Sequence, residues 1–159
     1  MSLQSIVKSL LALLLVFGVT NAVAQMYGTP MNLESAKKAA AAAVAEARKN
    51  NWNMIIAITD PNGDLIYLER MDNAQIGGVR VAFEKARSAA RFKRSTKVFQ
   101  DGVAGGGAGL RILGLHGAVP LDGGLLILKE GKIVGAIGVS GHNGDQDAQC
   151  AKAGVDALM

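Results

Sequence analysis

The sequence predicts an α+β fold in which a central antiparallel sheet is flanked by helices. Two pairs of strand-length apolar runs are each joined by a short turn sequence, which is the pattern of β-hairpins. Alanine-rich stretches with helical spacing lie before, between and after these two hairpins. Because hairpins give antiparallel strands and the helices separate the hairpins, we expect a mixed antiparallel sheet in a single domain.

The first 24 residues indicate a secretory signal peptide. Lys8 precedes an apolar run over residues 10–19, and Ala22-Val23-Ala24 has the small-x-small pattern of a signal-peptidase site. The apolar run is about half as long as a helix that spans a bilayer. We therefore expect cleavage after Ala24, a periplasmic or secreted protein, and no stable membrane insertion after cleavage. An uncleaved membrane anchor is the alternative.

The remaining chain has the length of one domain. Residues 25–31 contain a Gly and a Pro and are expected to form an extended lead-in to a domain over residues 32–159. Without Lys8 there are 16 basic and 13 acidic side chains, and this small excess does not indicate a nucleic-acid partner. Cys150 is the only cysteine, so no internal disulfide can form. Its place beside the apolar face of the last helix predicts an inert, partly buried thiol, and an intermolecular disulfide is the alternative.

The first half of the domain is expected to form a helix, a hairpin and a second helix. Asn32 is suited to cap a helix that ends near Asn50 and Asn51. Residues 54–59 and 65–70 are strand candidates, and Asp60-Pro61-Asn62-Gly63 between them matches a type I turn. Helical spacing returns over residues 75–91. The apolar faces of the two helices comprise Leu33, Ala36, Ala40, Ala43, Val44 and Ala47, and Val79, Ala82, Phe83, Ala86 and Ala90.

The second half ends in the clearer hairpin and a third helix. Lys93 would fall on the apolar face, so the second helix should end before it, and residues 96–103 can add a helical turn or two. Residues 105–109 are a glycine-rich connection with no strand signal. Strands are predicted over residues 125–128 and 133–139, joined by Lys129-Glu130-Gly131-Lys132. Asn143 or Asp145 then caps a helix with Ala148, Ala151, Val155 and Leu158 on its apolar face.

Several catalytic and metal motifs are incomplete. The glycine-rich segment lacks the Lys-Ser/Thr pair of a phosphate loop. Ser140-Gly141-His142 has His where the nucleophile elbow of a hydrolase needs its second Gly. His142, Asp145 and Asp147 fall short of the four ligands of a structural zinc site and are more typical of a helix cap, so we assign no metal site.

Two segments are candidates for binding an anion. Residues 80–97 carry seven basic side chains and one acidic side chain, Glu84, a local charge of +6. Residues 140–144 join a strand to a helix start, where backbone N–H groups and the helix dipole favour an anion. The alternatives are a solvated helix face and an ordinary capped turn.

A series of short motifs occurs along the domain in a fixed order. The motifs are Asp60-x-x-Gly63, Arg70-Met71-Asp72, Lys85-Ala86-Arg87-Ser88-Ala89, Thr96, Pro120-Leu121-x-Gly123-Gly124, Gly135-Ala136-Ile137-Gly138-Val139-Ser140-Gly141 and Asp147. Together they resemble the haem-binding GlcG/HbpS family, which is related to the C-terminal domain of PduO-type cobalamin adenosyltransferases. The similarity runs from about Asn32 to the C-terminus, and it implies a profilin-like fold that often assembles into oligomers.

The resemblance implies binding of haem or a related tetrapyrrole, in haem sensing, storage or handling. Candidate axial ligands are His116, His142 and the methionines, and basic side chains would pair with the propionates. We place the ligand where residues 140–144 approach residues 85–97. The binding residues expected there are Ser140, Gly141, Lys85, Arg91, Arg94 and Thr96.

An enzyme or sensor acting on an organic acid, such as a 2-hydroxy acid, is the alternative. Arg70 and Asp72 would then bind the substrate, but no nucleophile is paired with a base, so no catalytic residue is assigned and binding ranks above catalysis. We also expect a homo-oligomer with helical interfaces, because an alanine-rich helix and an apolar hairpin leave a small domain with much surface to cover.

Overall fold

The computed structural model describes residues 26–159, so the predicted signal peptide and its cleavage site lie outside the described residues. Within residues 26–159, no helix is both long and apolar enough to cross a membrane. The elements in chain order are α2 (Leu33–Lys49), β1 (Ile55–Thr59), β2 (Leu65–Arg70), α3 (Gly78–Phe92), α4 (Lys97–Ala104), the 3-10 helix η1 (Gly107–Gly114), β3 (Gly124–Lys129), β4 (Lys132–Ser140) and α5 (Gly144–Asp156).

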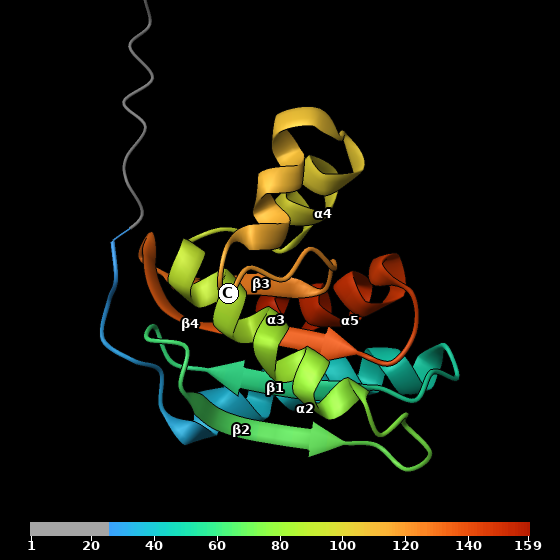
Figure 1. The fold of residues 1–159 in the computed structure, drawn as a ribbon. Helices are drawn as coiled ribbons and strands as arrows, with labels where there is room; N and C mark the ends of the chain where they lie inside the picture. Colours follow the sequence, from blue (N-terminus) through green and yellow to red (C-terminus); the bar gives the residue numbers. More distant parts are fainter. Residues whose placement is uncertain (1–25) are drawn as a thin grey trace, which may run out of the picture.

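A four-stranded antiparallel sheet with the order β2-β1-β4-β3 forms the centre of the fold. Helix α3 covers one face of the sheet, and α2 and α5 pack together on the other (Figure 1). Helix α4 and η1 contact each other and stand above these layers. The α+β prediction, with helices on both sides of a central antiparallel sheet in one domain, is confirmed.

Both hairpins form at the predicted turns. In the first turn the Gly63 N–H donates to the Asp60 carbonyl at 3.0 Å, and Asp60 Oδ1 accepts from the Asn62 and Asp64 N–H groups. In the second turn Glu130 and Gly131 have φ angles of 53° and 74°. Positive φ at both central residues is the geometry of a two-residue type I′ hairpin.

The helix boundaries follow the capping residues closely. Asn32 accepts from the Ser35 N–H at 2.8 Å, so the predicted cap of α2 is confirmed. Leu33, expected on the apolar face, is 49% exposed because the buried face begins at Ala36. Helix α3 begins at Gly78 rather than at Gln75, because residues 72–73 and 76–77 form turns.

Glycine brings α3 directly onto the sheet. A Cβ on Gly138 of β4 would collide with the Ala82 carbonyl and the Ala86 N–H of α3. On α3 itself, Ala82, Ala86, Ala89 and Ala90 are all buried. Small residues on both surfaces therefore set the distance between helix and sheet.

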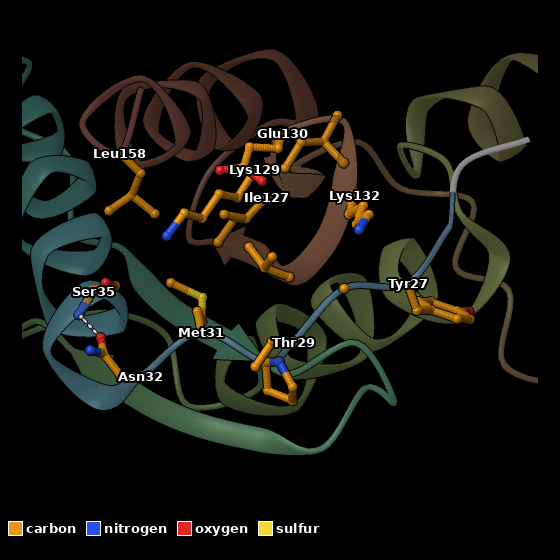
Figure 2. A pocket seen from close by; sticks show the side chains of 14 residues that line it. Tyr27, Thr29, Met31, Asn32, Ser35, Ile127, Lys129, Glu130, Lys132 and Leu158 are labelled. Carbon is orange, nitrogen blue, oxygen red and sulfur yellow. Dashed lines mark hydrogen bonds between the residues drawn. The ribbon is translucent and has the colours of Figure 1, made fainter. Parts of the chain in front are cut away.

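The lead-in runs beside the first half of β4. Tyr27 forms a parallel bridge with Ile133, the Gly28 N–H donates to the Ile133 carbonyl at 2.8 Å, and the Met31 N–H donates to the Val134 carbonyl at 2.9 Å. Strand β1 pairs only with residues 136–140 of β4. The lead-in pairs with the earlier residues of β4, which have no partner in β1. A cavity of about 720 Å³ lies between this segment and the β3–β4 hairpin (Figure 2).

Candidate functional site

The loop after β4 is closed by its own side chains. Asn143 Oδ1 accepts from the Gln146 N–H at 3.0 Å, and Gln146 Oε1 accepts from the Asn143 N–H at 3.4 Å. This reciprocal pair is a capping box, and it satisfies donors that we had expected to bind an anion. Of the two predicted capping residues, Asn143 caps α5.

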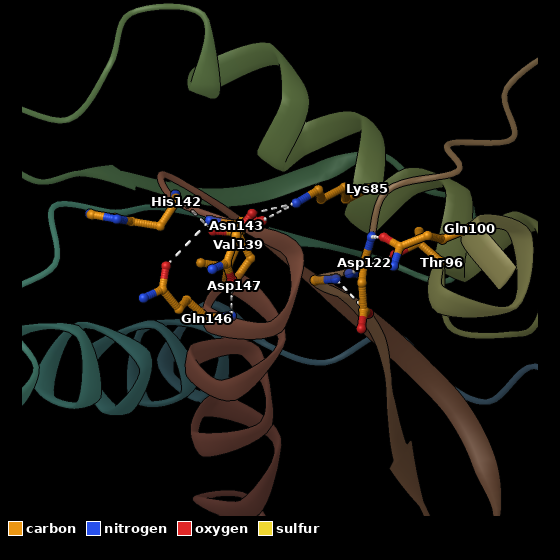
Figure 3. Close-up of polar contacts among 11 residues, drawn as sticks. Lys85, Thr96, Gln100, Asp122, Val139, His142, Asn143, Gln146 and Asp147 are labelled. Carbon is orange, nitrogen blue, oxygen red and sulfur yellow. Dashed lines mark hydrogen bonds and ion pairs between the residues drawn. The ribbon is translucent and has the colours of Figure 1, made fainter. Parts of the chain in front are cut away.

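A buried ion pair lies beneath this loop. Figure 3 shows Lys85 of α3 reaching toward Asp147 in the first turn of α5, and Lys85 Nζ donates to Asp147 Oδ2 at 2.6 Å and to the Val139 carbonyl at 2.9 Å. Both side chains are 2% exposed. The second carboxylate oxygen of Asp147 accepts from the His142 N–H at 3.1 Å. The pair thus ties α3 to α5 and fixes the backbone of the loop.

Burial and charge act in opposite directions on the Asp147 carboxyl. Burial raises its pKa, because the charged form loses its hydration, whereas hydrogen bonds from Lys85 and the His142 N–H oppose that increase. Lys85 was predicted to be a ligand-binding cation in a surface patch. Its ammonium is instead buried and bonded within the protein.

A second polar group next to the ion pair holds the start of β3. Thr96 is buried, and its hydroxyl accepts from the Gly124 N–H at 2.9 Å. Asp122 Oδ1 accepts from the Gly123 N–H, while Gln100 Oε1 accepts from the Asp122 N–H. Thr96 therefore positions the backbone here, and within residues 26–159 its side chain is not on an open binding surface.

The basic side chains do not gather around the loop as we predicted. Arg91 Nε donates to the Asn62 carbonyl at 2.8 Å, at the turn that follows β1. Ser140 pairs with Ile55 at the opposite end of β1. Four residue steps of a strand separate these ends by roughly 13 Å, so the predicted meeting of Arg91 with residues 140–144 is wrong.

Arg94 belongs to a different surface, near Phe92 and Phe99. Its Nε donates to the Phe92 carbonyl at 3.0 Å, and its guanidinium lies 5.8 Å from the centre of the Phe99 ring. The two Phe rings meet edge to face at 5.3 Å between centroids. A Cβ on Gly117 would lie 3.9 Å from the Phe92 ring, which places the residue after His116 against this aromatic pair.

The two histidines are both exposed, but in different surroundings. The His142 ring lies 6.1 Å from the Trp52 ring, beside the acidic first turn of α5. His116 follows η1, whose sequence neighbourhood carries exposed apolar side chains and Arg111. These exposed apolar side chains are Leu110, Leu113, Leu115 and Leu121.

The residues predicted to bind an organic acid lie at one end of the sheet. Ile55 pairs with Arg70 on one side and with Ser140 on the other, so Arg70 and Ser140 share that end. Arg70 and Asp72 are exposed, whereas Ser140 is buried. Gly141 is backed by Asn53 and Met54, against which a Cβ would collide. Within residues 26–159, no cluster of three His, Cys, Asp or Glu side chains could hold a metal ion.

Comparison with known proteins identifies the family. A model for haem-degrading, HbpS-like proteins matches residues 31–156. The chain belongs to the HbpS-like family. GlcG of Escherichia coli strain K12 is 39% identical over 100 residues, which cover 63% of this chain and 73% of GlcG.

Solved structures of HbpS-like proteins share the fold. A double mutant of Streptomyces reticuli HbpS is 32% identical, with a TM-score of 0.76 over 84% of this chain and 90% of that chain. A PduOC:haem complex is 25% identical, with a TM-score of 0.73 over 81% of this chain and 95% of that chain. The family resemblance inferred from the motifs is thus confirmed.

Sequence reasoning did not find the ion pair, although a signal was present. Lys85 lies three residues after Ala82 and four before Ala89, within the apolar face of α3. Asp147 likewise shares the buried face of α5 with Cys150, Ala151 and Gly154. A charged residue on the inner face of each of two helices predicts a buried partner, because unpaired buried charges are very costly.

Proposed function

We propose that this HbpS-like protein is an exported haem-binding protein that serves in haem storage, sensing or handling. The family match and the likeness to a PduOC:haem complex support this proposal. The structural observation that carries it is the surface around His116. The exposed His116 follows a stretch with the exposed Arg111, Leu113 and Leu115, and the neighbouring Gly117 lies near Phe92.

The residues around His116 fit the chemistry of haem. A protein-bound haem needs a donor for its iron, apolar contacts for the porphyrin and cations for the propionates. His116 supplies the donor, Leu113 and Leu115 supply apolar surface, and Arg94 and Arg111 supply positive charge. Iron held there would supply redox chemistry, while the chain would bind and orient the group.

His142 fits this role less well. Asp145, an exposed carboxylate in the first turn of α5, lies three residues after His142 and would repel the propionates. Residues 140–144 are also held by the capping box and by Asp147, so they are committed to stabilising the fold.

Haemin titration of the mature protein tests the proposal. We expect a saturable shift of the Soret band in the wild type and in His142→Ala, and its loss in His116→Ala. Arg94→Gln should weaken binding only several-fold, since an exposed ion pair contributes about 1 kcal/mol or less. Lys38→Gln, which removes an exposed charge from α2, is the matched control. No saturable shift in the wild type would refute the proposal.

Export and self-assembly complete the proposal. The sequence of residues 1–24 supports export, and intact mass of periplasmic protein should give a chain that begins at Gln25. Large apolar side chains that are exposed away from His116, among them Leu33, Leu65 and Ile76, favour a homo-oligomer, which sedimentation at micromolar concentration would detect. Retention of Met1 would contradict export, and a monomeric mass would contradict assembly.

A further inference from the structure

The cavity beside the lead-in is formed by segments from both ends of the domain. Its walls come from residues 27–32, the start of α2, the β3–β4 hairpin and Leu158 near the C-terminus. Its volume of about 720 Å³ lies within the range of small-molecule sites, roughly 300–1,000 Å³. None of its lining residues belongs to the surface around His116.

The lining combines an apolar wall with unpaired positive charge. Met31, Ile127, Val134 and Leu158 give the apolar part. Figure 2 shows Lys129 extending into the space between Leu158 and Met31, and Lys132 at the end nearer Tyr27. Among the described ion pairs of residues 26–159, neither lysine takes part. Glu130 is the one acidic side chain that lines this cavity.

The walls of the cavity are held in place by hydrogen bonds within the protein. The lead-in is bonded to β4 through Gly28 and Met31, and the Tyr27 hydroxyl donates to the Ala90 carbonyl at 3.1 Å. The start of α2 is fixed by the Asn32 cap. A cavity with fixed walls binds at a lower entropic cost than one that must form on binding.

We propose that this cavity binds an amphipathic carboxylate, with the carboxylate bonded to Lys129 and the apolar body against the partly exposed Met31 and Leu158. A lysine without an anionic partner supplies the charge-assisted hydrogen bond. The adjoining apolar wall favours a ligand with a hydrocarbon or aromatic part over a small, fully hydrated anion. This site is separate from the proposed haem surface.

Decanoate is the probe, and 1-decanol is its uncharged counterpart. Binding to the full mature protein is measured by calorimetry and mapped by amide NMR shifts. We expect saturable decanoate binding with shifts at Val134 and Leu158, and weaker binding of 1-decanol. Lys129→Gln should weaken decanoate binding several-fold, because Lys129 is exposed and an exposed charge pair contributes about 1 kcal/mol or less. Leu158→Ala should weaken both probes, and Lys38→Gln should change neither.

The outcomes separate this site from haem binding. The inference is overturned if decanoate does not saturate, if Lys129→Gln binds it as tightly as the wild type, or if 1-decanol binds equally well. It is also overturned if Lys129→Gln abolishes the haemin response, because the cavity would then belong to the haem site. Loss of haemin binding in His116→Ala with decanoate binding unchanged would support two separate sites. A failure of haemin binding alone would leave the decanoate result standing.

Discussion

Removing one partner of the Lys85–Asp147 pair should destabilise the protein severely. Both side chains are 2% exposed, so Lys85→Met leaves a buried carboxylate that has lost its cation. Breaking a buried ion pair in this way typically costs about 3–5 kcal/mol. Because single domains are stable by only about 5–15 kcal/mol, the variant should retain little stability. For a domain of this size, the loss would lower the unfolding midpoint by roughly 10–20 °C.

A double-mutant cycle identifies the cause. Replacing both partners, Lys85→Met with Asp147→Leu, should recover much of the loss, because no buried charge is then left alone. Lys152→Met is the matched control: Lys152 pairs with Asp156 of α5 at 2.5 Å, but its side chain is 69% exposed. That change should cost less than about 1 kcal/mol. Equal urea midpoints for Lys85→Met and Lys152→Met would refute this reasoning.

Three further predictions concern separate parts of the fold. Gly138→Ala should prevent soluble expression, because its Cβ would collide with the backbone of α3. Gly77→Ala has open space around its Cβ and should fold normally. Similar yields of the two variants would contradict this packing. Burial raises the pKa of the Cys150 thiol to about 12, so a thiol reagent at about pH 8 should label it only after unfolding, and rapid labelling of native protein would count against this burial. Hydrogen bonds from Gln149 and Asn50 lower the pKa of the Glu46 carboxyl. The stability that these contacts add is therefore present above the ordinary carboxyl pKa, and it is lost as the pH falls through the lowered pKa. Gln149→Ala should raise the Glu46 pKa in a carbon-13 NMR titration, and an unchanged value would exclude the contact as the cause.

Local chemistry made most of the fold predictable. The Asp60 turn and the Glu130-Gly131 turn each specify a tight connection, and Asn32 and Asn143 specify helix starts. The prediction that a helix ends before Lys93 is also confirmed, because Lys93 adopts a left-handed conformation with φ of 54°. Each of these features depends on a few consecutive residues, so it can be predicted from the sequence alone.

The candidate site was harder to predict because it depends on contacts between distant segments. Lys85 and Asp147 are 62 residues apart, and a cluster of basic residues does not reveal which member is turned inward. The glycine-rich residues after α4 gave no periodic signal, yet residues 107–114 form η1. The buried face of α5 also differs from the predicted one, because Asp147 points inward to Lys85. Cys150 and Gly154 therefore lie on the buried face, whereas Ala148 is only partly buried.

The contacts of α3 determine where the domain can move. The close approach at Gly138 and the Lys85–Asp147 pair join this helix to β4 and α5 at two separate places. Sliding of α3 along the sheet would break both contacts together, so α3 and the sheet should behave as one rigid body. The chain that follows α3 is also fixed, because Thr96 and Gln100 bond to the backbone at the start of β3, so movement relative to the sheet is expected only beyond Gln100. A ligand on the surface around His116 would then reorient η1 while α3, the start of α4 and the sheet stay still.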